Sequence, residues 1–384
     1  MSLQSKLPDV GTTIFTIMSR LATEHQAINL SQGFPDFDAD PALILAVSEA
    51  MAKGQNQYAP MPGLPELNVA IAQKLNHDYG WMPDPETEIT VTAGGTQALY
   101  SIIGAMIGQG DEVIVLEPSY DSYIPSVVSF GGVVKTVQLL PPFYKVNWDE
   151  VESLITPRTK LIMINTPHNP CGVVLEHADL TRLEQMVIKH GIYLISDEVY
   201  EHIIFDGHQH QSVLRYPELY KRSFVVFSFG KSLHVTGWKT GYVIAPPELT
   251  TELRKIHQFN VFSVNRPIQH GVAYYLKHHA DFAALSSFYQ DKRDLFLKLM
   301  SGLPLKFLPC YGSYFILADY SQVSSLDDRA FARQLTSEGG VATIPLSPFY
   351  RNGSDEKIIR FCFAKKEDTL IEAAERLNKY FKMS

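Results

Sequence analysis

Short apolar runs alternate with helical patterns between residues 89 and 245, and this alternation constrains the fold more than any other feature of the sequence. Continuous apolar runs are typical of strands buried on both faces, and helices between them connect parallel strands. The pattern predicts an α/β fold with a mostly parallel central sheet covered by helices. Strands are expected at 89–92, 112–116, 133–138, 161–164, 192–195, 224–228 and 242–245, with helices at 96–107, from near Tyr120, and at 178–190.

The pattern changes after residue 247. Helical periodicity dominates as far as 302, and short strands and helices then alternate. A chain of 384 residues also exceeds the ~250–300 residues at which a single core stops growing. We therefore expect a large domain of residues 45–275 and a smaller α+β domain of residues 276–384, and the N-terminal segment 1–44 is expected to belong to the smaller domain. In the smaller domain, strands are expected at 306–309, 313–317, 341–344 and 358–362, and helices at 327–337 and 366–381.

Composition argues against several classes of protein. The net charge is −8 without a long basic run, so nucleic acid is not an expected partner. The sequence contains no run of about 18 apolar residues, so no membrane span is expected. Cys171, Cys310 and Cys362 form a sparse, odd set that fits the reducing cytoplasm. His208 and His210 are expected in a surface loop without a third ligand, so no metal site is predicted.

Polar residues follow one expected strand after another at the point where each strand ends. Open parallel sheets bind ligands outside the carboxyl ends of their strands. Gly94-Gly95-Thr96 follows the first strand and opens a helix, where free N–H groups suit a phosphate. A plain glycine turn is the alternative for this loop alone.

Three further strand ends carry polar or aromatic groups. Prolines hold the loop around Asn169, so its side chain can offer a donor at a fixed position. Asp197 follows the 192–195 strand, with Tyr200 three residues later; a carboxylate buried there needs a partner, although aspartate is also a common helix N-cap. Tyr120 follows the 112–116 strand, where a core tyrosine is an equal alternative.

Lys231 follows the 224–228 strand in the stretch Ser228-Phe229-Gly230-Lys231. A phosphate-binding P-loop would need a glycine at the position of Val225. An exposed lysine in a turn is the alternative if the stretch is taken alone. Because Lys231 is the last of several polar residues placed on successive strand ends, we expect them to share one site.

These motifs resemble the class I, fold type I aminotransferases that depend on pyridoxal 5'-phosphate (PLP). The resemblance covers nearly the whole chain and is closest to the methionine and kynurenine aminotransferases, on the stretches 29–37, 56–58, 197–200, 236–242 and 312–315. It implies ping-pong transamination between an amino acid and a 2-oxo acid. It also implies a homodimer with shared active sites.

The resemblance implies a role for each strand-end residue. Lys231 binds PLP covalently and later moves the substrate proton as base and acid. Asp197 pairs with the pyridine nitrogen and keeps the ring an electron sink, while Tyr200 and Asn169 reach the phenolic oxygen. The other implied cofactor contacts are Gly94, Gly95, Thr96, Ser228 and Lys239 at the phosphate, Tyr120 on the ring face, and Tyr58 from the neighbouring subunit. Many class I members have arginine in place of Lys239, and lysine serves there as a point charge.

Arg360 lies in an apolar strand of the smaller domain, and its planar fork matches a carboxylate bidentately. A surface ion pair is the alternative. The resemblance implies that Arg360, Gly33 and Asn169 bind the substrate, the first two at its α-carboxylate.

The resemblance also places four aromatic residues near the substrate side chain: Phe15, Tyr58, Tyr123 and Phe262. Sulfur meets ring edges well, so such a wall favours thioether and large apolar groups. We expect methionine first, then phenylalanine, tyrosine, leucine and kynurenine, with aspartate disfavoured. Packing of a domain interface is the alternative role for these aromatics.

Two other functions stay open at this point. The same cofactor and fold support β-elimination, as in carbon–sulfur lyases. A PLP-binding regulatory protein without turnover would usually carry a DNA-binding segment, and residues 1–11 are too short for one.

Overall fold

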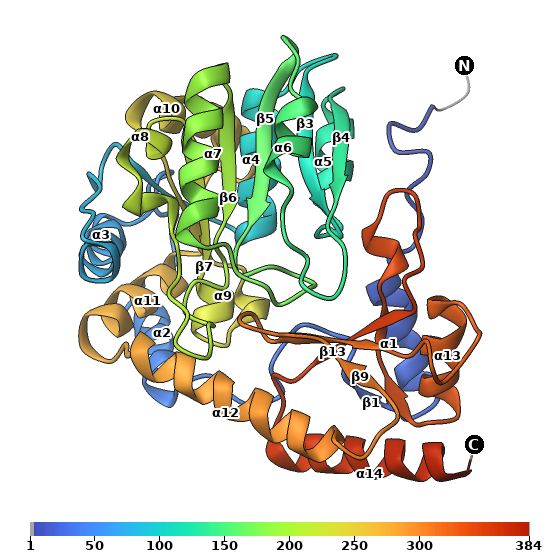
Figure 1. Ribbon diagram of the computed structural model, residues 1–384. Helices are drawn as coiled ribbons and strands as arrows, with labels where there is room; N and C mark the ends of the chain where they lie inside the picture. Colours follow the sequence, from blue (N-terminus) through green and yellow to red (C-terminus); the bar gives the residue numbers. More distant parts are fainter. Residues whose placement is uncertain (1–3, 384) are drawn as a thin grey trace.

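A seven-stranded sheet lies at the centre of the computed structural model, which describes residues 4–383 (Figure 1). Its strand order is β2-β8-β7-β6-β5-β3-β4. The strands from β3 to β7 run parallel, and β8 is antiparallel to both β2 and β7. The expected mostly parallel α/β sheet is confirmed. Its strands are β2 (Ile89–Thr92), β3 (Glu112–Glu117), β4 (Val133–Gln138), β5 (Thr159–Asn165), β6 (Tyr193–Asp197), β7 (Ser223–Ser228) and β8 (Gly241–Ile244).

Burial on both faces explains the continuous apolar runs. Successive side chains of a strand point to opposite faces, and in β3 Val113 belongs to one core cluster while Ile114 belongs to the other. α4 packs its Leu99 into the first cluster, and α7 packs its Leu183 into the second, so these helices lie on opposite sides of the sheet (Figure 1). The helices of this part include α4 (Gly95–Met106), α5 (Tyr123–Ser129), α6 (Trp148–Ser153), α7 (His177–His190), α8 (Pro217–Tyr220), α9 (Phe229–Ser232) and α10 (Pro247–Asn260).

A second, four-stranded sheet lies below the first, in the order β12-β13-β10-β9, with every neighbouring pair antiparallel (Figure 1). Three helices accompany it, and α12 packs against α14. The elements are α12 (Phe282–Met300), β9 (Lys306–Phe307), β10 (Phe315–Asp319), α13 (Asp328–Ser337), β12 (Ile344–Pro345), β13 (Ile358–Cys362) and α14 (Glu367–Met383).

The N-terminal segment packs with this second sheet region. β1 (Ile28–Asn29) pairs in parallel with β11 (Val341–Ala342), and α1 (Ile14–Glu24) contacts α13 (Figure 1). α2 (Pro41–Ala52) and α3 (Pro65–Tyr79) both pack against α11 (Arg266–His278). The domain boundaries at residues 44 and 275 stay a prediction.

Three of the differences from the expected element boundaries have a clear structural cause. The 341–344 strand is two short strands, because β11 pairs with β1 whereas β12 pairs with β13. α5 begins at Tyr123 rather than near Tyr120, since the preceding residues form a turn. β10 begins at Phe315 because Ser313 has a positive φ of 61° that interrupts an extended strand.

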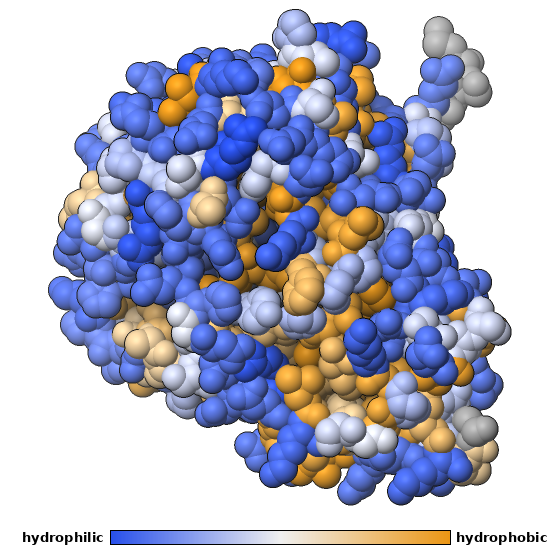
Figure 2. Space-filling model, viewed as in Figure 1, coloured by the Kyte–Doolittle hydropathy of each residue, from blue (hydrophilic) through white to orange (hydrophobic). Residues whose placement is uncertain are grey.

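The surface in the same view is mixed in polarity. Figure 2 shows polar residues over the upper part and hydrophobic residues gathered along the centre and in the lower part of this face. Within residues 4–383, no helix has both the length and the apolar character that crossing a membrane requires.

Candidate active site

The carboxyl ends of the parallel strands open into a cavity of about 330 Å³. Residues of the N-terminal segment, β10 and β13 also line it. It therefore lies between the large sheet and the smaller one, where the strand-end rule predicts a ligand site. The cavity brings together the predicted residues Phe15, Gly33, Gly94, Gly95, Thr96, Tyr120, Asn169, Asp197, Tyr200, Ser228, Lys231, Lys239 and Arg360.

Lys231 lies in the short helix α9, directly after β7. Its Nζ donates to Tyr314 Oη at 2.7 Å and approaches the Gly33 carbonyl oxygen at 3.5 Å. Burial lowers the pKa of Lys231 to about 8. A substantial fraction of the amine is thus neutral near physiological pH, as a nucleophile or base must be.

Asp197 is the last residue of β6 and is only 4% exposed. Tyr123 Oη donates to its Oδ2 at 2.6 Å, and the Val199 amide donates to Oδ1 at 3.3 Å. Burial raises the pKa of Asp197 to about 6. A carboxylate buried among neutral donors is stabilised by a cation, and a protonated pyridine nitrogen is such a partner.

The two asparagines of the proline-rich loop bind different partners. Asn165 Nδ2 donates to the Asp197 carbonyl oxygen at 2.8 Å, and its Oδ1 accepts from the Asn169 amide at 2.7 Å. Asn165 therefore ties the Asn169 loop to the strand end that carries Asp197. No role was predicted for Asn165, although its recurrence beside Asn169 in the motif was a signal for one.

Arg360 is 1% exposed in the middle of β13. Its Nη1 donates to Asn169 Oδ1 at 2.8 Å, its Nη2 donates to the Ser31 carbonyl oxygen at 3.1 Å, and its guanidinium carbon lies 3.8 Å from the Phe315 ring centroid. Burial lowers the pKa of Arg360 to about 10.

Among residues 4–383, no carboxylate forms an ion pair with Arg360, and its Nε is buried without a hydrogen-bond partner. A buried cation without an anion is costly. The carboxylate of a ligand entering the cavity would supply the missing charge.

Another group of residues lining the cavity suits a phosphate. Gly94 has a φ of +81°, and a Cβ built there would lie 3.5 Å from Lys239 Nζ, so the backbone and the ammonium approach closely. α4 begins at Gly95, so its free N–H groups face the same region. Thr96 Oγ1 lies 3.1 Å from Tyr120 Oη. A cation, a helix N-terminus and hydroxyl groups are the donor set that the phosphate of PLP requires.

Tyr123 is expected near the substrate side chain, but the structure places it in the core next to Asp197. Its side chain is 3% exposed, packs in the core beside the sheet, and does not line the cavity. Its hydroxyl is committed to Asp197. Tyr123 therefore holds the Asp197 carboxylate in position through a hydrogen bond from outside the cavity.

Tyr58 and Phe262 also lie outside the cavity of their own chain. They are 78% and 46% exposed, and their rings meet edge to face with centroids 5.3 Å apart. Phe262 is expected near the substrate side chain, and within its own chain it does not line the cavity.

Several cavity residues were not predicted. Asp121, Gln32 and Phe315 line the cavity, and Tyr314 binds Lys231 from outside it. Gln32 lies in the stretch 29–37, and Tyr314 and Phe315 lie in the stretch 312–315, both of which carry the family resemblance, but that resemblance assigned these three residues no role.

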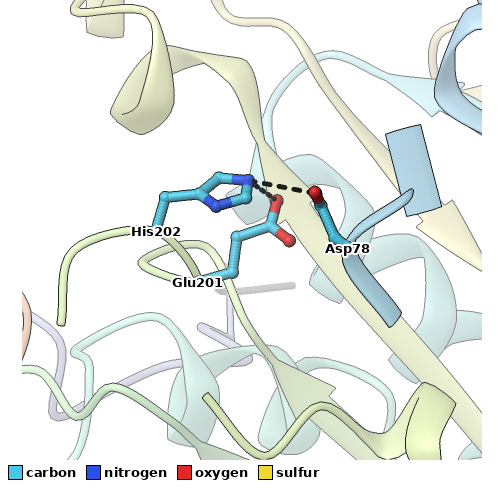
Figure 3. A group of neighbouring side chains, drawn as sticks. All are labelled: Asp78, Glu201 and His202. Carbon is cyan, nitrogen blue, oxygen red and sulfur yellow. Dashed lines mark ion pairs between the residues drawn. The ribbon is translucent and has the colours of Figure 1, made fainter. Parts of the chain in front are cut away.

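A group of side chains that could ligate a metal lies apart from the cavity: Asp78, Glu201 and His202 (Figure 3). His202 Nε2 lies 3.4 Å from Glu201 Oε1 and 3.7 Å from Asp78 Oδ2. Lys74 Nζ, however, lies 2.8 Å from Glu201 Oε1 and 3.1 Å from Asp78 Oδ2. The ammonium group already neutralises these carboxylates, so the group is better described as an ion-pair network.

The surface position expected for His210 is wrong. His210 is 8% exposed, and its Nε2 hydrogen-bonds Glu198 Oε2 at 2.8 Å. Glu198 follows Asp197, and its fully buried carboxylate also accepts from Ser196 Oγ and the Val213 amide. His210 therefore helps to satisfy a buried acid next to the site.

Comparison with known proteins agrees with this geometry. The family model for class I and II aminotransferases matches residues 25–377. Methionine aminotransferase of Escherichia coli (strain K12) is 52% identical, over 98% of this chain and 98% of its own. A kynurenine–oxoglutarate transaminase of Dictyostelium discoideum is 34% identical, over 96% of this chain and 94% of its own.

A solved structure is equally similar. The crystal structure of an Escherichia coli protein with a methionine aminotransferase function superposes with a TM-score of 0.96 at 51% identity, covering 99% of this chain and 100% of that chain. The family resemblance and the fold type I architecture expected from the sequence are thereby confirmed. Together with the near-complete family match, they show that this chain belongs to the class I and II aminotransferases, which depend on PLP.

Proposed function

We propose that the protein moves the α-amino group of methionine to a 2-oxo acid, with large apolar and aromatic amino acids and kynurenine as further donors. The observation that carries the proposal is the cavity itself. It joins Lys231 and Asp197 to a buried Arg360 that has no anionic partner, and the aromatic rings of Phe15 and Phe315 lie against that arginine. The similarity to a methionine aminotransferase supports the choice of donor.

Each residue has a defined task in this reaction. PLP, when bound, withdraws the electrons that the Cα–H bond of the substrate leaves behind. The Lys231 amine takes the Cα proton as a base and returns it as an acid. The Asp197 carboxylate keeps a positive charge on the ring nitrogen, and Arg360 holds the α-carboxylate. Asn169 accepts from Arg360 through Oδ1, so its Nδ2 is left as the donor that would bind the phenolic oxygen of PLP.

Methionine should exceed aspartate as amino donor by at least ~100-fold in kcat/KM, about 2.7 kcal/mol of discrimination. Among the described residues lining the cavity, Arg360 is the only arginine, and the Asp121 carboxylate lies in the same cavity. Lys231 and Lys239 also line the cavity, but both are assigned to the cofactor, so an acidic side chain would meet the Asp121 carboxylate without a cation of its own. Steady-state rates with one shared 2-oxo acid acceptor measure the ratio.

Leucine is the matched control for this comparison, because it is apolar without sulfur. A preference for aspartate would refute the choice of substrate while leaving the transaminase chemistry intact. Pyruvate release from cystathionine at a rate comparable with amino transfer from methionine would instead favour the β-lyase function.

A homodimer with shared active sites is part of the proposal. Tyr58 and Phe262 form an exposed aromatic pair, and Phe259 nearby in sequence is 87% exposed. Exposed aromatic surface of this kind is typical of interfaces. A second copy covering it would bring Tyr58 to the neighbouring cofactor phosphate, as the family resemblance implies.

Tyr58→Phe should raise the dissociation constant of PLP about tenfold, the effect of losing one hydrogen bond to a charged group. The variant should remain a dimer, because the ring stays. Fluorescence titration of the apoenzyme measures the constant, and sedimentation measures the mass. Tyr274→Phe, another exposed tyrosine, is the control. Unchanged PLP affinity in Tyr58→Phe would remove Tyr58 from the phosphate site.

The proposal also places the enzyme in the cytoplasm. All three cysteines are buried thiols without disulfide bonds. Such a set is compatible with a reducing compartment.

A further inference from the structure

Tyr314 connects three separate parts of the chain through one hydroxyl group. It precedes β10 and is fully buried. Its Oη accepts a hydrogen bond from Lys231 Nζ at 2.7 Å and donates one to the Gly33 carbonyl oxygen at 2.6 Å. The described residues that line the cavity do not include Tyr314. Its hydrogen bond with Lys231 is therefore made outside the cavity lining.

The direction of these bonds follows from the number of hydrogens. A tyrosine hydroxyl carries one hydrogen, and a carbonyl oxygen can only accept. The hydrogen of Tyr314 therefore points to Gly33, so its oxygen must accept from Lys231. A neutral Lys231 amine that donates to Tyr314 keeps its lone pair free. If Tyr314 donated instead, it would occupy the lone pair that a base needs.

Packing holds the hydroxyl in this arrangement. The Tyr314 ring meets Tyr200 edge to face at 5.2 Å and lies 5.8 Å from the Tyr289 ring. Burial raises the pKa of Tyr314 well above its usual value, so the phenol stays protonated at working pH. It cannot itself act as the base.

We propose that Tyr314 is a positioning residue that holds the released Lys231 amine with its lone pair directed into the cavity. The inference rests on the proposed transaminase function for its role in turnover. The Gly33 carbonyl aligns Tyr314, so the N-terminal segment and the second sheet are both needed to orient the lysine.

The test is Tyr314→Phe, with Tyr289→Phe as the matched control. Tyr289 is equally buried and packs on the same ring, and its hydroxyl has no hydrogen-bond partner among the described residues. Each variant loses one hydroxyl group, and the two tyrosines are neighbours in the core. Thermal unfolding shows whether each is folded.

The first measurement is the pKa of Lys231 in the full chain loaded with pyridoxamine phosphate, which leaves the lysine amine free. Competitive acetylation over a range of pH, read by mass spectrometry of the peptide that contains Lys231, gives the value. A hydrogen bond accepted from an ammonium group is stronger than one from a neutral amine. Tyr314→Phe should therefore lower the pKa by about one unit, a tenfold loss of proton affinity, while Tyr289→Phe leaves it unchanged.

The second measurement is the division between kcat and KM for methionine. With a weaker and less oriented base, Tyr314→Phe should lower kcat about 30-fold. KM should stay within about twofold, since Tyr314 does not line the cavity. A general packing defect would affect both constants and would not shift the pKa of one lysine.

Equal effects of the two substitutions on the Lys231 pKa and on kcat would overturn the proposal. The acetylation measurement requires no turnover, so it stays decisive even if methionine proves a poor substrate. Tyr314→Met is a second variant, because a flexible thioether fills irregular core sites and its sulfur accepts only weakly. It should lower the Lys231 pKa in the same direction.

Discussion

Lys231→Ala should abolish multiple turnover, and borohydride should no longer fix PLP to the protein. The chain loses both its nucleophile and the base that moves the Cα proton, so the expected loss is several orders of magnitude. The lowered pKa of about 8 for Lys231 and its place at the end of β7 motivate this expectation. Mass spectrometry after borohydride reduction measures the attachment, and stopped-flow absorbance measures turnover.

Lys239→Ala is the control for this experiment. It removes a neighbouring ammonium group from the same cavity but leaves Lys231 in place. At saturating PLP, borohydride should still fix the cofactor to this variant. If borohydride fixed as much PLP to Lys231→Ala as to the wild type, another lysine would bind the cofactor and the assignment of Lys231 would be refuted.

Asp197→Asn should slow Cα deprotonation by about 10³-fold or more, roughly 4 kcal/mol of barrier, while PLP still binds. A neutral amide leaves the ring nitrogen without its counter-charge, so the ring withdraws electrons poorly. Single-turnover rates with methionine measure this step. A rate within about tenfold of the wild type would rule out the proposed role of Asp197.

The same carboxylate predicts a pH dependence of cofactor binding. Burial raises the pKa of Asp197 to about 6 before a cation is bound. The carboxylate form, which pairs with a protonated ring nitrogen, is present above that pH and is lost as pH falls through it. PLP affinity should therefore weaken below about pH 6 in the wild type, and Asp197→Asn should lose this dependence on the carboxylate.

Tyr123→Phe tests how much the position of the Asp197 carboxylate matters, as distinct from its charge. Tyr123 donates to Oδ2 at 2.6 Å, so its removal leaves the charge but frees the carboxylate to move. The effect on deprotonation should be about tenfold, much smaller than that of Asp197→Asn. If Tyr123→Phe slowed deprotonation as much as Asp197→Asn does, the position of the Asp197 carboxylate would matter more than its charge.

The sequence alone determined the sheet and the edge where the site lies. Apolar runs such as Val113–Leu116 in β3 can be satisfied only when both faces are covered, which predicts helices on both sides. Parallel strands bring their carboxyl ends to one edge, so Asn169, Asp197 and Lys231 converge although the chain separates them. Local pattern was sufficient here because periodicity and strand direction are properties of short segments.

Only the tertiary structure decided which partner each polar group has. Arg360 binds Asn169 across 191 positions of sequence, and Lys231 binds Tyr314 across 83. In the structure, the Tyr123 hydroxyl binds Asp197, and Phe262 lies outside the cavity of its own chain. A hydrogen bond depends on a few tenths of an ångström and on the direction of a side chain. No periodicity records either quantity, so contacts between distant segments had to come from the folded chain.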